Sequence, residues 1–439
     1  MASESVPGSP ALIPGLIRRF ALGLTLQAVL AVVPITFLLL FPSPWMSLGF
    51  AAVIGLFGCR WIALGSPLPE TRVNLLILLF LAATLAGLLH SSAPDLAVLT
   101  AGQLVASVTI FFVLQDKAKA SSDLWHAAVV LAMLGILFAL AAPFTVNWSP
   151  DKVYDIPVFY KLTWPQLPKV TNSNILAGGL AVIAPIALAL VMQPERRRRL
   201  LGAVSFASIG VMLVLLQSRG ALFALGVGLA VWIILYNRWF LALIPIGLLG
   251  ALYINQVSGG PPPAQFLYGK IGTVTGGSLT ERQDLWFQAL YLIRQSPLVG
   301  IGLGAYQRIA PYAWPYSLSQ PSTLIEPHAH NLFLQVALDT GLFGLAAFTV
   351  LIFVSFSSAW RAWRSRVEPH LAIAVIAALT VVVVHGLGDT IVWGTAKPSI
   401  VLWIVLGLAT RLEQLRREQG SRQSHGQRPD AAALSDTEK

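Results

Sequence analysis

Residues 171–199 read TNSNILAGGLAVIAPIALALVMQPERRRR, and this stretch decides the fold class. The run from 174 to 193 is uncharged and about as long as a helix that crosses the hydrocarbon core of a bilayer. Four consecutive arginines, Arg196 to Arg199, follow it, as is typical of the cytoplasmic end of a spanning helix. The stretch therefore predicts a membrane-crossing helix together with its orientation.

Composition extends this prediction to the whole chain. Of the 439 residues, 56% are hydrophobic and 11% are charged, with a mean hydropathy of +0.73. A soluble domain, which is about 25% charged, needs far more polar surface than this. The net charge of +10 does not indicate a nucleic-acid partner, because the basic residues lie in short clusters between apolar runs. Cys59 is the single cysteine, so an intramolecular disulfide and a cysteine-based metal site are excluded.

Apolar runs of spanning length recur along the chain and predict an all-α polytopic membrane protein of about twelve helices surrounded by membrane lipids. Together they make residues 1–411 a single transmembrane domain, and the polar tail 412–439 is expected to be disordered. Placing both termini in the cytoplasm puts most of the 29 Lys and Arg on the inner side. The runs cover 20–41, 46–65, 73–90, 95–115, 124–143, 174–193, 200–217, 220–237, 239–255, 332–357, 370–388 and 397–411.

Two connections, 144–173 and 256–331, are longer than the rest, and both fall on the outer face. The second is a large periplasmic loop in this orientation, long enough to be functional. Its segment SLTERQDLWFQALYLIRQSP predicts an amphipathic helix near the membrane surface, with Ser278 or Thr280 as the N-cap. PLVGIGLGAY follows, and its glycines do not predict a dinucleotide loop because no strand precedes them.

The motif EPHAHN ends the large loop and carries the first candidate site. A histidine titrates near working pH, so His328 or His330 could act as a general base. Asn331 could orient a ring nitrogen or cap the next helix. The two histidines could instead ligate a metal ion, with Glu326 and Asp389 as further ligands. A third alternative is that they merely pack at the membrane interface, and the residues alone leave all three open.

Two arginines and one acid complete the candidates. Arg219 stands in the tight connection QSRG, and a guanidinium group fits phosphate oxygens. Arg282 lies one helical turn before Trp286, and a cation beside an indole suits a phosphorylated lipid or a sugar. Asp389 ends HGLGD, where it could fix a histidine tautomer or pair with an arginine. The plainer alternatives are snorkelling for Arg219, a solvated face for Arg282 and a turn for Asp389.

All these groups fall on the predicted outer face. Arginines beside histidine and carboxylate suit an anionic, membrane-borne substrate that is attacked by an activated hydroxyl. Without a metal ion, the arginines would neutralise a pyrophosphate leaving group. A transporter or flippase of lipid-linked glycans is the alternative of another class, but its charges should line a cavity at mid-bilayer.

The order of these features resembles the O-antigen ligase and O-antigen polymerase superfamily. The resemblance covers most of the chain, most clearly 172–389, and TNSNILAGGLAVIAP is similar to the family's entry into its central spans. The other shared features are twelve spans, a large outer loop before the last three, SRG after the seventh, a loop arginine followed by a tryptophan, PLVGIGLG, and HAHN opening the next span.

The resemblance implies a GT-C-like glycosyltransferase of lipopolysaccharide biosynthesis that needs neither a metal ion nor a cofactor. The donor would be a glycan on undecaprenyl pyrophosphate, and the acceptor a sugar hydroxyl of the lipid A core. His330 maps to the family's base, while His328 would position the acceptor. Arg219 and Arg282 map to the arginines that hold the pyrophosphate, and Asp389 maps to a functional acid.

Three kinds of protein compete within the superfamily: the ligases, the polymerases and the protein O-oligosaccharyltransferases. The last usually carry a longer C-terminal region, and polymerases usually show two comparable outer loops. This chain has a short tail and one dominant loop, which favours the ligase. The expected location is the bacterial inner membrane, with the active site on the periplasmic side.

Overall fold

The computed structural model describes residues 28–40, 44–146, 172–237, 279–313, 327–394 and 399–426, besides a few single positions. Within these ranges every regular element is an α-helix. The helices are α2 (Ala28–Leu40), α3 (Met46–Leu64), α4 (Asn74–His90), α5 (Pro94–Lys117), α6 (Ser121–Thr145), α8 (Ser173–Val191), α9 (Arg196–Leu216), α10 (Arg219–Asn237), α13 (Leu279–Gln295), α14 (Tyr306–Ala313), α15 (Leu332–Arg364), α16 (Pro369–Gly386) and α17 (Ser399–Gly426).

These helices confirm a multi-pass, all-helical membrane protein. Eight of the described helices are long and apolar enough to cross a membrane, and α2 and α4 are shorter apolar helices. Eleven of the predicted runs overlap a described helix, whereas most of the run 239–255 and most of the loop 144–173 lie outside the described residues. The total of twelve spans therefore stays a prediction.

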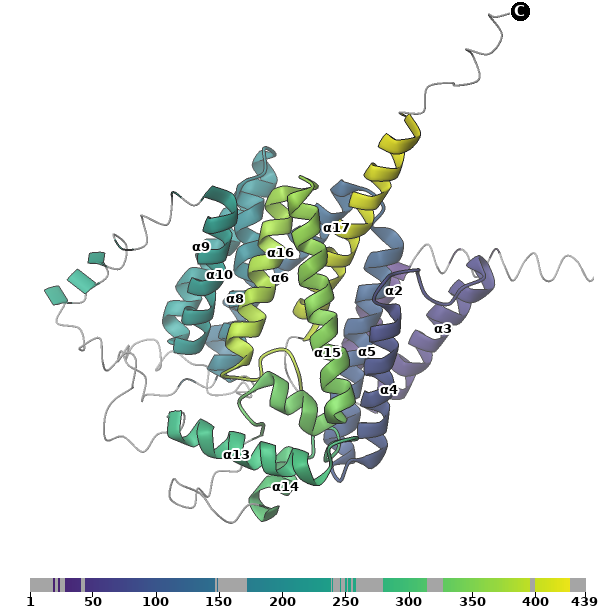
Figure 1. Cartoon of the computed structure of the whole chain (residues 1–439), viewed down its shortest axis with the longest axis vertical. Helices are drawn as coiled ribbons and strands as arrows, with labels where there is room; N and C mark the ends of the chain where they lie inside the picture. The colour runs from purple at the N-terminus through teal and green to yellow at the C-terminus, as the bar shows by residue number, and fades with distance from the viewer. Residues whose placement is uncertain are drawn as a thin grey trace, which may run out of the picture.

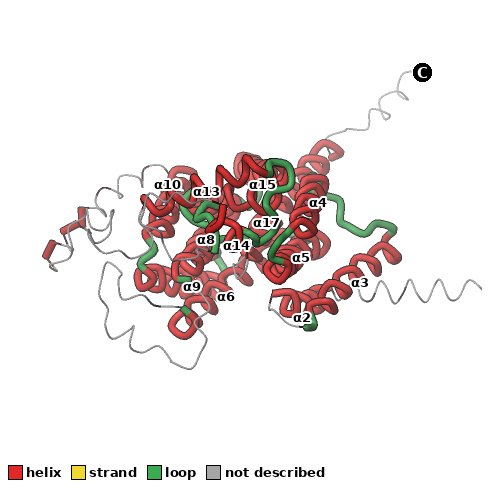
Figure 2. The backbone as a smooth tube through the Cα atoms, turned by 90° about the horizontal axis from the view of Figure 1, so that it is seen from below, coloured by secondary structure: helices red, strands yellow, loops and turns green. Residues whose placement is uncertain are grey.

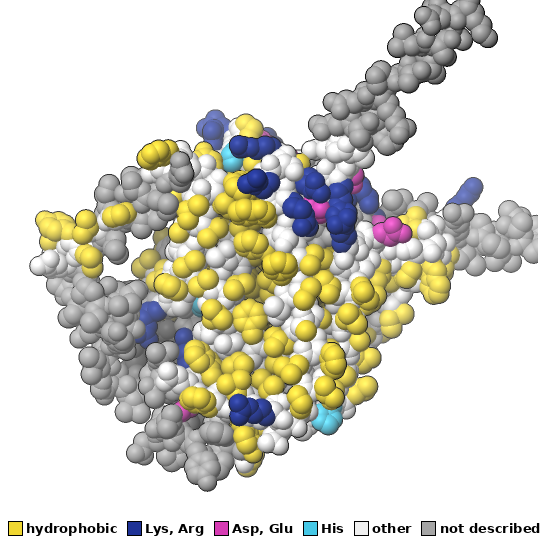
Figure 3. Space-filling view, viewed as in Figure 1, with side chains coloured by type: hydrophobic (Ala, Val, Ile, Leu, Met, Phe, Trp, Pro, Cys, Tyr) yellow, Lys and Arg dark blue, Asp and Glu magenta, His cyan; other side chains and the backbone are white. Residues whose placement is uncertain are grey.

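The centre of the bundle is made by α8 and α16, most of whose residues are buried. Around them pack α6, α9, α10 and α15, and α17 packs against α5. Seen along the bundle, α2 and α3 stand to one side, next to α5 (Figure 2). The outer helices carry exposed apolar side chains such as Leu89 (79%) and Phe353 (68%). Hydrophobic side chains cover the middle of the face in Figure 3, as expected of a surface that contacts lipid.

The amphipathic helix expected in the large loop is present as α13. Together with α14 it lies across the lower end of the bundle (Figure 1). This is the end opposite the arginine run, because α9 begins at Arg196 and ends beside Arg219. The helix begins at Leu279, so Thr280 lies inside it and is not its N-cap, and the other candidate, Ser278, lies outside the described residues.

The glycine-rich segment 297–305 fastens α13 to the bundle. Leu342 N donates to Pro297 O at 2.8 Å, and Ile301 N donates to Leu338 O at 2.7 Å. Leu303 N donates to the carbonyl of Gly87 at 3.0 Å. These contacts require two backbone segments to approach closely, and glycine allows this because it has no side chain.

Helix α15 changes direction at Gly341, where φ is 71° and ψ is −179°. A Cβ atom at this position would lie 2.0 Å from Leu298 O. The Gly341→Ala variant is therefore expected to lose about 3 kcal/mol of stability, from backbone strain and overpacking together. Thermal unfolding in detergent measures the loss. Gly55→Ala in α3, where a Cβ meets nothing within 4 Å, is the matched control, and equal melting of the two variants would contradict this prediction.

The disorder predicted from 412 is wrong up to Gly426, because α17 continues as a helix to that residue. Arg416 and Arg417 lie one turn after Glu413 and pair with it, each at 2.8 Å. Such pairs at spacings of three and four residues stabilise an otherwise polar helix. The disordered tail expected over 412–439 is thus helical to 426, and residues beyond 426 lie outside the described part.

Candidate active site

A histidine–aspartate cluster lies at the lower end of the bundle, where α15 begins and α16 ends. His328 Nε2 and His330 Nδ1 each lie 3.2 Å from Asp389 Oδ1. The two imidazole rings are 4.3 Å apart between centroids. The Asp389 side chain is 2% exposed, and that of His330 is 15% exposed, compared with 6% for His328. His330 is therefore the more accessible of the two histidines.

The Asp389 carboxyl is held in its ionised form. Burial acts to raise its pKa, but the hydrogen bonds from His328 and His330 outweigh burial and hold the pKa well below its ordinary value. The unfolded value is about 3.9. The cluster therefore stabilises the fold above that pH, and this contribution is lost as the pH falls toward the lowered folded value.

Several backbone contacts fix the position of His330. Its φ of 46° lies in the left-handed region, which non-glycine residues occupy rarely and mostly at special sites. Trp286 on α13 donates its Nε1–H to His330 O at 3.2 Å. Asn331 caps α15 through Phe333 N and Leu334 N, and its amide nitrogen donates to Leu387 O at 3.0 Å. The loop histidine is thereby tied to α13, α15 and the end of α16.

One candidate arginine approaches this cluster from another helix, and the second interacts with the first. Arg282 comes from α13, and its Nη1 lies 3.4 Å from the place that a Cβ of Gly388 would take. Arg219 is the first residue of α10, and its charge interacts with that of Arg282. Two like charges that interact favour binding of an anion between or beside them.

His385 on α16 is a site residue to which the sequence assigned no role. Its side chain is buried, and it lies between two glycines from different helices. A Cβ at Gly178 of α8 would lie 2.9 Å from His385 Nδ1, and one at Gly220 of α10 would lie 3.1 Å from Nε2. The absence of side chains at these two positions makes room for the imidazole beside Arg219.

Asp339 on α15 was also missed, and it joins three segments beneath the histidines. Its carboxylate accepts hydrogen bonds from Gly304 N (3.1 Å), Gln335 Nε2 (3.1 Å) and Trp393 Nε1 (2.7 Å). Gln335 in turn accepts from the backbone N–H of Ala329, between the two histidines. The sequence carried a signal for it, because an acid inside an apolar run is expensive unless it is partnered.

The structure thus brings together most of the predicted site residues. They are Arg219, Arg282, Trp286, His328, His330, Asn331 and Asp389. Glu326 lies outside the described residues. Trp286 donates a hydrogen bond to the His330 backbone, a contact that its spacing from Arg282 did not predict. Asn331 caps α15, which is one of the two roles proposed for it.

Three buried polar atoms around Asp389 have no hydrogen-bond partner among the described residues: Arg282 Nε, His385 Nδ1 and Asp389 Oδ2. Such atoms are rare in folded proteins because an unmade buried hydrogen bond costs about 1–3 kcal/mol. Their concentration at one place is typical of a site that contacts a polar substrate.

The cluster also has the composition of a metal centre. Ligand atoms of His328, His330 and Asp389 all lie within 4.8 Å of one another. Two histidines and a carboxylate are a known donor set for zinc and iron. General-base chemistry and metal binding thus share the same three side chains, and a chelator distinguishes them.

Comparisons with known proteins match the part of the chain that carries most of these residues. Residues 203–349 match the family described as O-antigen ligase, a stretch that includes Arg219, Arg282, His328 and His330. A relative, the exopolysaccharide production protein ExoQ of Rhizobium meliloti (strain 1021), is 28% identical over 171 residues. That match covers 36% of this chain and 38% of the relative. The resemblance inferred from the motifs is confirmed over the matched stretch.

Proposed function

We propose that this chain, with its O-antigen ligase segment at 203–349, transfers a glycan from undecaprenyl pyrophosphate to a sugar hydroxyl of the lipid A core. Both comparisons support a membrane protein of the glycan ligase or polymerase type. The proposal goes further by naming donor, acceptor and residue roles. In it the chain lies in the bacterial inner membrane with the site on the periplasmic side and both termini in the cytoplasm, in a GT-C-like architecture.

The observation that carries the proposal is an arginine, Arg282, that lies beside a histidine–aspartate pair and interacts with a second arginine, Arg219. Arg219 and Arg282 come from α10 and α13, and the pair is formed by His330 and Asp389. A general base beside two cations suits displacement of an anionic leaving group by a hydroxyl. The arginines hold the pyrophosphate oxygens by charge-assisted hydrogen bonds.

The chemical step follows from the His330 contacts. Because Nδ1 faces the ionised Asp389, it carries the proton, and Nε2 keeps the lone pair that accepts the hydroxyl proton. The acceptor oxygen forms a bond to the anomeric carbon while the bond from that carbon to the pyrophosphate oxygen breaks. Undecaprenyl pyrophosphate is the leaving group, and Arg219 and Arg282 stabilise its negative charge. A single displacement inverts the anomeric configuration.

An acceptor panel tests the proposal. Purified protein is given a lipid-pyrophosphate glycan together with rough lipopolysaccharide, with a Ser-containing acceptor protein, or alone. Glycan transfer to lipopolysaccharide is expected. Elongation of the donor in place of this transfer would make the chain a polymerase, and transfer to the protein would make it an O-oligosaccharyltransferase. Movement of the donor across liposome membranes without transfer would make it a flippase.

Polymerisation is the second candidate, and one observation favours it. The relative in Rhizobium meliloti is named for exopolysaccharide production, not for lipopolysaccharide. The same arginines and histidine would serve either reaction, because only the lipid that carries the acceptor hydroxyl differs. The acceptor panel separates the two by product size.

The Asp389→Asn variant is expected to transfer about a hundredfold more slowly, because an amide does not stabilise the protonated imidazole. A carboxylate 3.2 Å away favours the charged form of His330. Removing the carboxylate is therefore expected to shift the pH below which the rate falls to a lower value. Rates measured between pH 5 and 8 check both effects, and an unchanged pH dependence would contradict the assigned pair.

A further inference from the structure

A cavity lies at the opposite end of the molecule from the histidine cluster. Its volume is about 310 Å³, and it lies between the start of α4, the end of α15 and the polar part of α17. The lining residues used below are Glu70, Arg72, Val354, Glu413 and Arg417. In the proposed orientation this end faces the cytoplasm.

Four guanidinium groups surround one buried carboxylate beside this cavity. Glu413 is 5% exposed and lies 2.8 Å from Arg416, 2.8 Å from Arg417 and 3.4 Å from Arg361. Arg72 also interacts with Glu413. Each guanidinium offers about five N–H donors, whereas one carboxylate offers about four acceptor positions. The cavity itself is lined by two acids, Glu70 and Glu413, and by two arginines, Arg72 and Arg417. The excess of positive charge and of donors comes from Arg361 and Arg416, which pair with Glu413.

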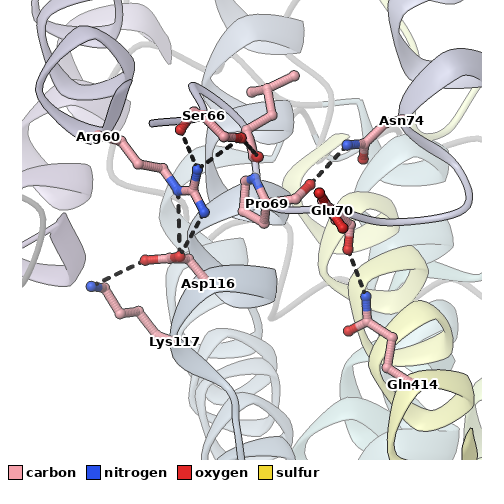
Figure 4. A network of polar contacts seen from close by, with 9 residues as sticks. Arg60, Ser66, Pro69, Glu70, Asn74, Asp116, Lys117 and Gln414 are labelled. Atoms are coloured by element: carbon pink, nitrogen blue, oxygen red, sulfur yellow. Dashed lines mark hydrogen bonds and ion pairs between the residues drawn. The ribbon is translucent and has the colours of Figure 1, made fainter. Parts of the chain in front are cut away.

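The wall of the cavity is held in place by hydrogen bonds. Gln414 Nε2 donates to Glu70 O at 3.1 Å, and Asn74 Nδ2 donates to Pro69 O at 2.7 Å (Figure 4). On the next helices Arg60 pairs with Asp116 at 3.3 Å. The cavity is thus bounded by a loop that is hydrogen-bonded to α17, and its arginines are not isolated surface side chains.

Apolar side chains that face outward flank the cavity. Leu75, Leu78 and Leu79 at the start of α4 are 47–68% exposed, and Phe353, next to the cavity-lining Val354, is 68% exposed. In Figure 3 most of the Lys and Arg side chains in view lie at the upper end of the face, above a largely hydrophobic middle. A free phosphate would contact the arginines alone, whereas a phospholipid would contact the arginines with its headgroup and the apolar side chains with its acyl chains.

We infer that this cavity binds the phosphate headgroup of an anionic phospholipid, with its acyl chains along the exposed faces of α4 and α15. Basic pockets between helices at the cytoplasmic interface suit such headgroups, because arginine donates paired hydrogen bonds to phosphate oxygens. The bound lipid would join α4, α15 and α17, three helices that Glu413 and its arginines already connect.

Lipid titration in detergent micelles tests the inference. Thermal stabilisation of the full chain is measured with phosphatidylglycerol, with phosphatidylcholine and with inorganic phosphate. Phosphatidylglycerol is expected to bind at least about tenfold more tightly than phosphatidylcholine, since each basic residue near an anionic surface contributes several-fold. The variant Arg72→Gln/Arg417→Gln is expected to lose this preference.

The matched control is Arg197→Gln/Arg199→Gln, which removes the same charge from an exposed arginine run at the same end. It is expected to keep the preference. Val354→Trp, which fills the cavity without changing charge, is expected to lose it, so the result does not depend on the double arginine variant folding. Equal losses in the control, equal binding of phosphatidylcholine, or stabilisation by inorganic phosphate alone would each overturn the inference.

Discussion

The His330→Ala variant is expected to transfer glycan about 10²–10⁴-fold more slowly than the wild type, the usual contribution of a positioned general base. His330 is the more accessible histidine, and Asp389 orients its ring at 3.2 Å. Removing the imidazole leaves the acceptor hydroxyl without a base, while the arginines still bind the donor. The loss is therefore expected in kcat, with little change in the KM for the donor.

His328→Ala is the comparison that makes the first prediction specific. His328 contacts the same carboxylate oxygen, but its side chain is more deeply buried. Its loss is expected to slow transfer about tenfold by loosening Asp389. If His328→Ala were the slower variant, His328 would be the base. If both variants retained wild-type rates, neither histidine would act in proton transfer.

The Arg282→Gln variant is expected to lose about 10²–10³-fold in kcat, as when one donor to a developing negative charge is removed. Arg282 reaches the histidine cluster from α13, and its Nε is a buried donor without a partner among the described residues. Its charge interacts with that of Arg219, so the double variant Arg219→Gln/Arg282→Gln is expected to lose less than the product of the two single losses.

Arg294→Gln is the matched control for this charge change. Arg294 lies in the last turn of α13, on the same helix as Arg282, and is exposed. It is expected to keep the wild-type rate. Steady-state transfer with increasing donor separates kcat from KM, and equal losses at Arg282 and Arg294 would contradict a pyrophosphate role for Arg282.

The membrane fold could be predicted from composition and run length because lipid requires helices wherever the chain crosses it. The bend of α15 at Gly341 could not, since one glycine in an apolar run is equally compatible with a straight helix. The extension of α17 was missed because its polar residues suggest disorder until Glu413 is seen between its arginines.

The candidate site was predictable as a set of outer-face residues but not as a geometry. Arg219, Arg282 and His330 stood out because charged and titratable groups at a membrane face need partners. His385 could not be assigned in the same way. Its place depends on Gly178 and Gly220, which come from two other helices and gain meaning only when the three segments meet.

The measurement that tests the central claim most directly is single-turnover glycan transfer by purified wild-type protein in the presence of a strong chelator. General-base catalysis by His330 predicts the same rate with and without chelator, with inversion at the anomeric carbon. Loss of transfer that is restored by added divalent metal ion would contradict it. That result would make His328, His330 and Asp389 the ligands of a catalytic metal ion.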